Sequence, residues 1–231
     1  MFRKVIILFV ALFLVNAKLG IDVSQPHSEE VLKCFINQGY SFIVARGYKS
    51  FGAVDTNAIG TLTNAQKAGM SDTGIYMFPC TSTSKTAQSQ VSELINGIKG
   101  VDYNRIWIDV ETNQSPNCGW TKDYEANCNF MKSLVSAIKA TGKEVGIYAS
   151  HYMWTSIFGS ADNCAAFSTI PLWYAHYDHT PSFTDFQAFG GWKTPYAKQY
   201  AGTTSMCGGS VDLNFKNWVM GKFIDFIDML I

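Results

Sequence analysis

Short apolar runs alternate along the chain with stretches in which apolar residues recur at helical spacing. Each run is rich in bulky and β-branched residues and is bounded by glycine or polar residues, which is typical of buried strands. The runs predict eight strands, over residues 19–23, 40–47, 74–79, 105–111, 144–150, 172–177, 197–200 and 211–215. The helical spacing predicts helices over 29–37, 61–68, 86–98 and 123–140, and the final apolar segment, 217–231, is also expected to be helical.

The lengths of the connections predict how these strands are arranged. Parallel neighbours need crossovers of about a dozen residues, so the early strands, which are separated by helices, are expected to be parallel. The closely spaced late strands are expected to be antiparallel. No internal repeat or interdomain linker is visible. The pattern therefore predicts an α/β fold, a single-domain irregular (β/α) barrel.

Two carboxylates stand at the end of the fourth predicted strand. Asp109 and Glu111 alternate along it, so they point to the same face, roughly 6–7 Å apart along the backbone. Charged residues are rarely buried without a partner or a function. An ion pair with Arg46 or Arg105 is the structural explanation. The functional one is acid-catalysed glycoside cleavage, which needs paired carboxylates, although this spacing does not separate retaining from inverting enzymes.

Barrel closure adds further groups to this pair. Active sites of β/α barrels lie where the C-terminal ends of the strands converge, and closure places the first strand beside the last. Asp22 and Asp212 should therefore join Asp109 and Glu111 in one cleft, where clustering raises the pKa of one carboxyl enough to hold a proton near neutral pH. The other candidate site residues at strand ends are Arg46, Tyr76, Tyr148, Trp173 and Gln199.

The first residues have the composition of a secretory signal. Arg3 and Lys4 precede an apolar stretch over residues 5–15, and Val15-Asn16-Ala17 offers a small-residue cleavage site. The stretch is too short to span a bilayer comfortably. We expect a signal peptide over 1–17, a catalytic barrel over 18–231 and no membrane span in the mature chain. Extracellular fluid, a gut lumen and lysosome-like vesicles are all compatible destinations.

Charge and composition narrow the partners. Without Arg3 and Lys4, 16 basic residues face 18 acidic ones, a formal charge of −2. This balance argues against nucleic acid. The aromatic content of 14% suits carbohydrate, because the C–H faces of sugars stack on aromatic rings. The four histidines show no metal-ligand spacing, although His176 and His179 could touch substrate. We expect no cofactor, no metal and a monomer.

Six cysteines follow the expected cleavage site. An even number in a secreted chain predicts up to three disulfides, and the sequence does not choose among the pairings. Cys118 and Cys128 flank the loop after the fourth strand, which makes a bond between them attractive. Zinc is the alternative, but the wide spacings and the lack of a Cys-x-x-Cys motif argue against it.

Four segments together resemble glycoside hydrolase family 25, the Ch-type lysozymes or N-acetylmuramidases. The likeness covers about residues 19–218 and rests on the order and spacing of Gly20–Ser24, Trp107–Glu111, Leu172–Ala175 and Val211–Asn214. It implies a flattened, modified barrel that cleaves the β-1,4 bond between N-acetylmuramic acid and N-acetylglucosamine in bacterial peptidoglycan.

The resemblance also implies a role for each candidate residue. Glu111 would be the general acid, and Asp109 would stabilise a nucleophile that is the substrate's own 2-acetamido group. Asp22 and Asp212 would hold and tune this pair. The residues that would line the sugar site are Tyr76, Tyr148, Trp173 and Gln199.

Two other functions compete with a secreted muramidase of defence or digestion. A chitinase-like hydrolase shares Asp-x-Glu on the fourth strand, but its pattern wants acidic residues where this chain has Trp107 and Asn104. A catalytically silent carbohydrate-binding barrel usually lacks the acid, and Glu111 is present. The muramidase is therefore the expected function.

Overall fold

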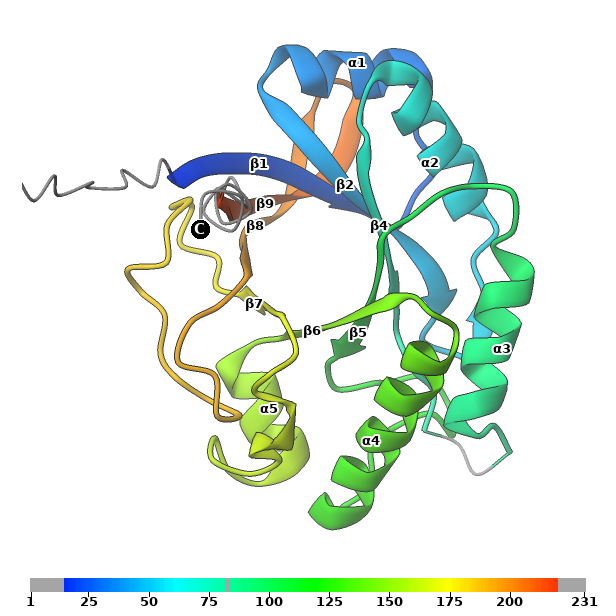
Figure 1. Cartoon of the computed structure of the whole chain (residues 1–231), viewed down its shortest axis with the longest axis vertical. Coiled ribbons are helices and arrows are strands. Elements are labelled where there is room, and N and C mark those ends of the chain that lie inside the picture. The colour runs from blue at the N-terminus through cyan, green and yellow to red at the C-terminus, as the bar shows by residue number, and fades with distance from the viewer. Residues whose placement is uncertain (1–14, 82–83, 220–231) are drawn as a thin grey trace, which may run out of the picture.

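The sheet closes on itself. The computed structural model describes residues 15–81 and 84–219, and in these ranges eight strands form a barrel in the order β1-β2-β4-β5-β6-β7-β8-β9, with β9 paired back to β1 (Figure 1). The two-residue strand β3 pairs with the end of β2 outside the ring. The strands are β1 (Val15–Val23), β2 (Tyr40–Lys49), β3 (Ala53–Val54), β4 (Asp72–Met77), β5 (Arg105–Val110), β6 (Glu144–Ala149), β7 (Leu172–Ala175), β8 (Ala197–Met206) and β9 (Gly209–Val219).

Strand direction changes only at the last strand of the ring. Pairing is parallel from β1 through β8, and β9 is antiparallel to both β8 and β1. The single-domain barrel with an antiparallel closing strand is confirmed. The expectation that all the late strands are antiparallel was wrong for β7 and β8. The connection 176–196 is long enough to cross over without a helix, so these two strands run parallel.

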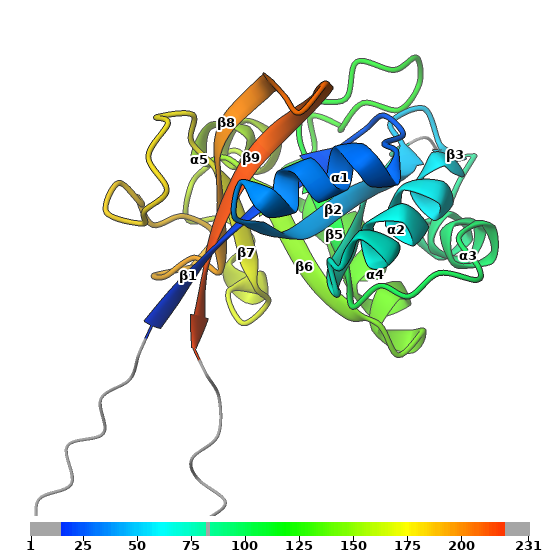
Figure 2. The ribbon, with the colours of Figure 1, turned by 90° about the horizontal axis from the view of Figure 1, so that it is seen from above.

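Helices pack on the outside of the barrel. They are α1 (Glu29–Asn37), α2 (Asn57–Ala68), α3 (Ala87–Gly97), α4 (Tyr124–Ala140) and α5 (His151–Phe158), with a short 3-10 helix, η1 (Ala165–Phe167). α2, α3 and α4 lie along one side, and the long loop 176–196 runs on the other (Figure 1). α1 crosses the strands close to β2 (Figure 2). None of the helices in the described ranges has the length and apolarity needed to cross a membrane.

Side chains capping the helices explain where several of them begin. Ser28, Thr86, Asp123 and Ser150 each accept a backbone N–H from the first turn of the following helix. α5 and η1 were not predicted, because the segment around them is rich in Ser, Asp and Asn. Its apolar residues nevertheless reach the core: Trp154 and Phe158 are fully buried.

The barrel interior is filled with side chains. Val44, Trp107, Tyr148, Trp173 and Ala197 form an inner cluster that is separate from the larger core between sheet and helices. The rings of Trp107 and Trp173 meet edge to face, with centroids 5.5 Å apart. Trp107 thus packs inside the barrel, on the opposite face of β5 from Ile106 and Ile108, and the barrel is no open pore.

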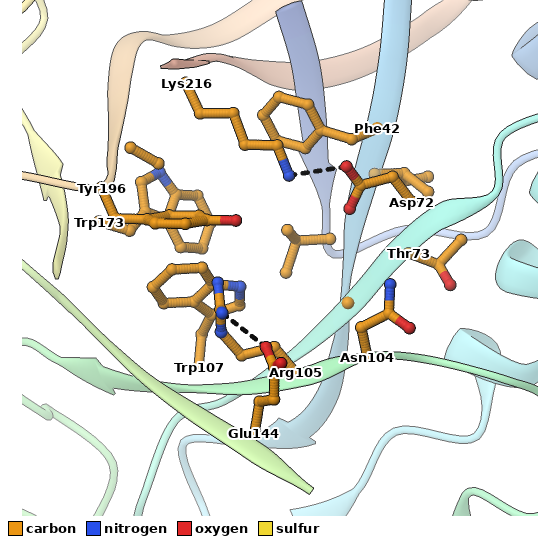
Figure 3. Close-up of a pocket in the computed structure, with 14 residues that line it drawn as sticks. Phe42, Asp72, Thr73, Asn104, Arg105, Trp107, Glu144, Trp173, Tyr196 and Lys216 are labelled. Carbon is orange, nitrogen blue, oxygen red and sulfur yellow. Dashed lines mark hydrogen bonds and ion pairs between the residues drawn. The ribbon is translucent and has the colours of Figure 1, made fainter. Parts of the chain in front are cut away.

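Charge pairs and aromatic rings line a pocket at the end of the barrel where the parallel strands begin (Figure 3). Lys216 Nζ lies 2.8 Å from a carboxylate oxygen of Asp72, and Arg105 Nη2 lies 2.6 Å from one of Glu144. The Arg105 guanidinium also lies 4.5 Å from the Tyr196 ring centroid. Arg105 therefore forms its ion pair and ring contact at this end of the barrel, and it is not an ion-pair partner of Asp109 or Glu111.

All six cysteines form disulfides: Cys34–Cys207, Cys80–Cys118 and Cys128–Cys164. The expected bond between Cys118 and Cys128 was wrong. Cys118 lies against the loop that follows β4, where its carbonyl accepts the Thr81 N–H at 3.2 Å, whereas Cys128 lies within α4. Because all six cysteines form disulfides, none has a thiolate free to bind zinc, which rules out the zinc alternative.

The ends of several elements differ from the predictions. α2 begins four residues early, at Asn57, and β8 and β9 extend into a long hairpin. Residues 217–219 continue β9, so the expected final helix was wrong there, and its remainder, 220–231, lies outside the described residues. Residues 1–14 of the expected signal peptide also lie outside them, and 15–17 belong to β1.

Candidate active site

Four carboxylates meet at the C-terminal ends of the parallel strands. They share a cavity of about 100 Å³, whose lining is Asp22, Tyr76, Asp109, Glu111, Tyr148, Trp173, Tyr177, Gln199 and Asp212. Eight of the nine residues expected from the sequence are among them. The structure thus brings together side chains that lie up to 190 positions apart, from Asp22 to Asp212.

Strand register explains this convergence. Asp22 is directly opposite Asp212 in the antiparallel pairing of β1 and β9. Asp109 is opposite Tyr148 in the parallel pairing of β5 and β6, and Glu111 follows one residue after β5. The Trp120 indole N–H donates to the Glu111 carbonyl at 2.8 Å, which fixes the backbone of the residue just beyond the strand.

Asn214 holds Asp22 in place. Its Nδ2 donates to Asp22 Oδ2 at 2.7 Å, while its Oδ1 accepts the Trp173 indole N–H at 2.8 Å. Because the indole can only donate, the orientation of the amide is fixed. The Asn214 side chain is fully buried, so both interactions are shielded from water.

Gln199 is oriented in the same manner. The hydroxyls of Tyr148 and Tyr177 donate to its Oε1, at 2.5 and 2.8 Å. Its Nε2 then donates to Asp22 Oδ2 at 2.9 Å and to Asp212 Oδ2 at 3.1 Å. One buried amide thereby joins the first and last strands of the barrel through their carboxylates.

Asp109 is buried with one oxygen that lacks a hydrogen-bond donor among the described residues. Its side chain is 5% exposed, and within the described ranges its buried Oδ1 accepts no hydrogen bond. Burial, followed by the negative charges of Glu111 and Asp22, raises the pKa of Asp109 well above its usual range. A buried acceptor without a donor is costly, so this oxygen is suited to accept an N–H or O–H from a bound molecule.

The neighbouring carboxyls are shifted in the same direction. Burial and the charge of Asp212 raise the pKa of Asp22 to about 7, despite the bonds from Asn214 and Gln199. Burial, followed by the charge of Asp212, also raises the pKa of Glu111. Burial raises the pKa of Asp212, opposed by the N–H of Thr203. The cluster therefore retains a proton near neutral pH, which makes it able to act as an acid.

Arg46 does not line this cavity. Its Nε lies 2.8 Å from Asp55 Oδ2, and its Nη2 donates to the Ser24 carbonyl at 3.1 Å. The candidate role of counter-ion to the four carboxylates was wrong, because a fifth carboxylate, Asp55, takes up its guanidinium. Asp55 is 1% exposed, so this pair stabilises the loop that leads into α2.

Three further contributors lie outside the nine candidate residues. Asn214 stands two residues beyond Asp212, on the same face of its strand, and that alternation could have identified it. Tyr177 lies just beyond β7, where the strand-end rule applies equally. Thr203 donates its backbone N–H to Asp212 Oδ1 at 2.5 Å, and no side-chain signal marks such a contact.

Comparisons with known proteins identify the family of this chain. Residues 14–200 match the family described as Lysozyme-like protein 1. The chain is 39% identical over 209 residues to the "Probable GH family 25 lysozyme 2" of Dictyostelium discoideum, covering 90% of this chain and 94% of that protein.

Solved structures share the fold at lower identity. A lysozyme from Streptomyces coelicolor superimposes with a TM-score of 0.72 and 22% identity, over 90% of this chain and 94% of that one. The autolysin LytC from Streptococcus pneumoniae, in complex with a synthetic peptidoglycan ligand, superimposes with a TM-score of 0.70 and 17% identity, over 88% and 47%. By its family match and its 39% identity to a GH25 relative, this chain belongs to the family 25 lysozymes, which are glycoside hydrolases.

Proposed function

We propose that this protein is a secreted lysozyme that hydrolyses the β-1,4 bond between N-acetylmuramic acid and N-acetylglucosamine in bacterial peptidoglycan. The observation that carries the proposal is the buried, unpartnered Oδ1 of Asp109 beside Glu111 in a four-carboxylate cavity. Peptidoglycan sugars carry a 2-acetamido N–H, a donor suited to that oxygen. The similarity to a probable lysozyme of Dictyostelium and the peptidoglycan ligand of LytC support this class of substrate.

In the first proposed step, Glu111 acts as general acid. Burial and the charge of Asp212 raise its pKa, which favours the protonated form that a general acid needs. The acetamido oxygen of the substrate attacks the anomeric carbon while the bond to the leaving oxygen breaks, and Glu111 gives its proton to that oxygen. Asp109 accepts the acetamido N–H and offsets the positive charge that develops on this group.

In the second step, water attacks the anomeric carbon and gives a proton to the Glu111 carboxylate, and the acetamido group is restored. The enzyme regains its starting protonation state. Asp22 and Asp212, held by Gln199 and Asn214, keep negative charge near the reacting carbon. Tyr76, Tyr148, Trp173 and Gln199 surround the sugar at the cleaved bond.

We further propose that residues 1–17 are removed and that the mature protein acts outside the cytosol, in extracellular fluid, a gut lumen or a lysosome-like vesicle. Three disulfides are compatible with such an oxidising compartment. Antibacterial defence or digestion is the proposed role, and the mature protein is proposed to be a monomer.

Digestion of purified peptidoglycan tests the reaction directly. After reduction of the products, we expect N-acetylmuramic acid at the new reducing ends. N-acetylglucosamine there, or activity on chitin alone, would refute the muramidase assignment. Tight binding to cell walls without any product would instead indicate a catalytically silent barrel.

Single substitutions test the assignment of roles. Glu111→Gln should lower kcat by about 10²–10⁴-fold, the contribution typical of a positioned acid. Asp109→Asn should lower kcat as well, because the amide can no longer offset the charge of the acetamido group. Near-UV circular dichroism of each variant provides the folding control, and an unchanged rate for Glu111→Gln would remove that residue from the mechanism.

A further inference from the structure

A second cavity lies beside the catalytic one, at the same end of the barrel. Its volume of about 280 Å³ exceeds that of the catalytic cavity, at about 100 Å³. It lies between the start of α5, the end of β7 and the loop 176–196, and its lining includes Ser150, Tyr152, Ala175, His176, Gln187 and Phe189. These elements lie next to one another in the ribbon (Figure 1).

The two cavities are close neighbours along β6 and β7. Ser150 stands two residues beyond Tyr148, and Ala175 stands two beyond Trp173. Tyr148 and Trp173 line the catalytic cavity, and two strand residues span roughly 7 Å. A polymer that leaves the catalytic cavity across β6 and β7 therefore passes over the second cavity.

The lining of the second cavity combines apolar rings with polar groups. Tyr174 and Phe189 are almost fully buried beneath it, at 4% and 2% exposed. Tyr152, which also lines the cavity, is 72% exposed. Ser150, His176 and Gln187 add hydroxyl, imidazole and amide groups. Apolar surfaces with a few convergent polar groups match a sugar ring, which has apolar faces and a polar edge.

Buried charges hold one wall of this cavity in place. The Lys198 side chain is fully buried, and its Nζ lies 2.7 Å from Asp185 and 2.8 Å from Asp178. Asp185 in turn lies 2.6 Å from His176 Nδ1, which leaves Nε2 for another partner. A wall that is ordered before binding loses little entropy when a ligand arrives.

Tyr177 lines the catalytic cavity and belongs to the loop 176–196, which also borders the second cavity. Its hydroxyl donates to Gln199, and its ring rests on Gly202, where a Cβ would lie 3.0 Å from Cε2. Tyr177 is 54% exposed, although these two contacts fix the hydroxyl end of its ring. An exposed tyrosine thus borders each cavity: Tyr177 the catalytic one and Tyr152 the second.

We propose that the second cavity is an additional sugar subsite, which binds a ring of the glycan strand beyond those at the cleaved bond, with Tyr152 stacked on its apolar face. This inference rests on the proposed peptidoglycan hydrolysis. It predicts that long strands are cleaved more efficiently than short ones and that this advantage depends on Tyr152.

The test compares peptide-free glycan strands with a short oligosaccharide that fills only the catalytic cavity. For the wild-type protein, kcat/KM should be higher on long strands. Tyr152→Ala should lower that value about tenfold on long strands and leave the short substrate unchanged, as expected for loss of one aromatic contact. Tyr124→Ala is the matched control, since Tyr124 is 49% exposed and lines neither cavity.

Each outcome separates the subsite from the reaction. If the wild-type protein cleaves neither substrate, the proposed function fails. If it cleaves both equally well, or if Tyr152→Ala lowers both rates alike, the function stands and the subsite is refuted. A loss confined to peptide-bearing strands would also overturn it, because the cavity would then bind the stem peptide.

Discussion

The Asn214 amide on β9 donates a hydrogen bond to the Asp22 carboxylate on β1, at 2.7 Å. The two residues lie near opposite ends of the described chain. The bond stabilises the carboxylate form and lowers the pKa of Asp22, against burial and the charge of Asp212, which raise it. The balance of these effects places that pKa at about 7. The amide is therefore positioned to set how this carboxyl titrates.

Asn214→Ala should move the pH–rate profile. Without the N–H donor the pKa of Asp22 rises further, so the limb of the profile that reports this carboxyl shifts to higher pH. Loss of a hydrogen bond to a charged group should also lower kcat by about 10–100-fold. Trp173→Phe removes the indole N–H that orients the amide, together with ring area packed on Trp107 and Tyr148, and should give a smaller shift in the same direction. A profile unchanged in both variants would show that Asn214 has only a packing role.

Asp22→Asn should stabilise the protein in a pH-dependent way. The folded-state pKa of about 7 lies above the ordinary value of 3.8, so Asp22 favours the folded state below about pH 4 and loses that contribution as pH rises to 7. The amide variant does not ionise. Its Tm should exceed that of the wild type at pH 7.5, and the difference should shrink toward pH 4. Equal Tm differences at both pH values would contradict this. Asp162→Asn, at an exposed position, is the control and should leave the Tm unchanged at both pH values.

The Cys80–Cys118 disulfide should matter for both stability and rate. It joins the loop after β4 to the loop after Glu111, where Asn113 also donates to the Ser50 carbonyl at 2.7 Å. Cys80→Ser with Cys118→Ser should cost about 2–5 kcal/mol of unfolding free energy and lower kcat as well. The matched pair Cys128→Ser and Cys164→Ser, away from the catalytic cavity, should reduce stability without changing kcat. Urea titrations and steady-state kinetics measure the two effects, and equal losses of kcat would contradict a local role.

Arg46→Met should affect folding and not substrate binding. Asp55 would be left buried without its guanidinium partner, although Lys49 lies 3.7 Å from its other oxygen. The expected loss is about 1–3 kcal/mol of unfolding free energy, with KM unchanged. A raised KM in a fully folded variant would restore Arg46 as a sugar contact.

Alternation and strand order were enough to predict most of the cavity. Asp109 and Glu111 followed from the period of one strand, and Asp22 and Asp212 from closure of the barrel. The prediction for Arg46 failed because its partner Asp55 lies in a loop that no periodicity places. The three expected disulfides are present, but the favoured Cys118–Cys128 pair was wrong for a similar reason: neighbours in sequence were favoured, and Cys118 faces the loop after a different strand.

Elements of mixed composition were the other source of error. Polar residues between the fifth and sixth predicted strands, which are β6 and β7, concealed α5. Its buried residues Trp154 and Phe158 pack in the core. Parallel pairing of β7 and β8 was missed because the late strands were all treated as closely spaced. The loop 176–196 is in fact long enough for a crossover, and it is fixed by the pairing of Lys198 with Asp178 and Asp185.

The antiparallel pairing of β9 with β1 also concerns biosynthesis. Asp22 is synthesised early. Its partner strand β9, which carries Asp212 and Asn214, emerges from the ribosome about 190 residues later. Contacts so distant in sequence form slowly. A nascent or truncated chain that lacks β9 would carry Glu111 and Asp109 without a closed cavity around them. The hydrolase would then remain inert until its last strand is in place.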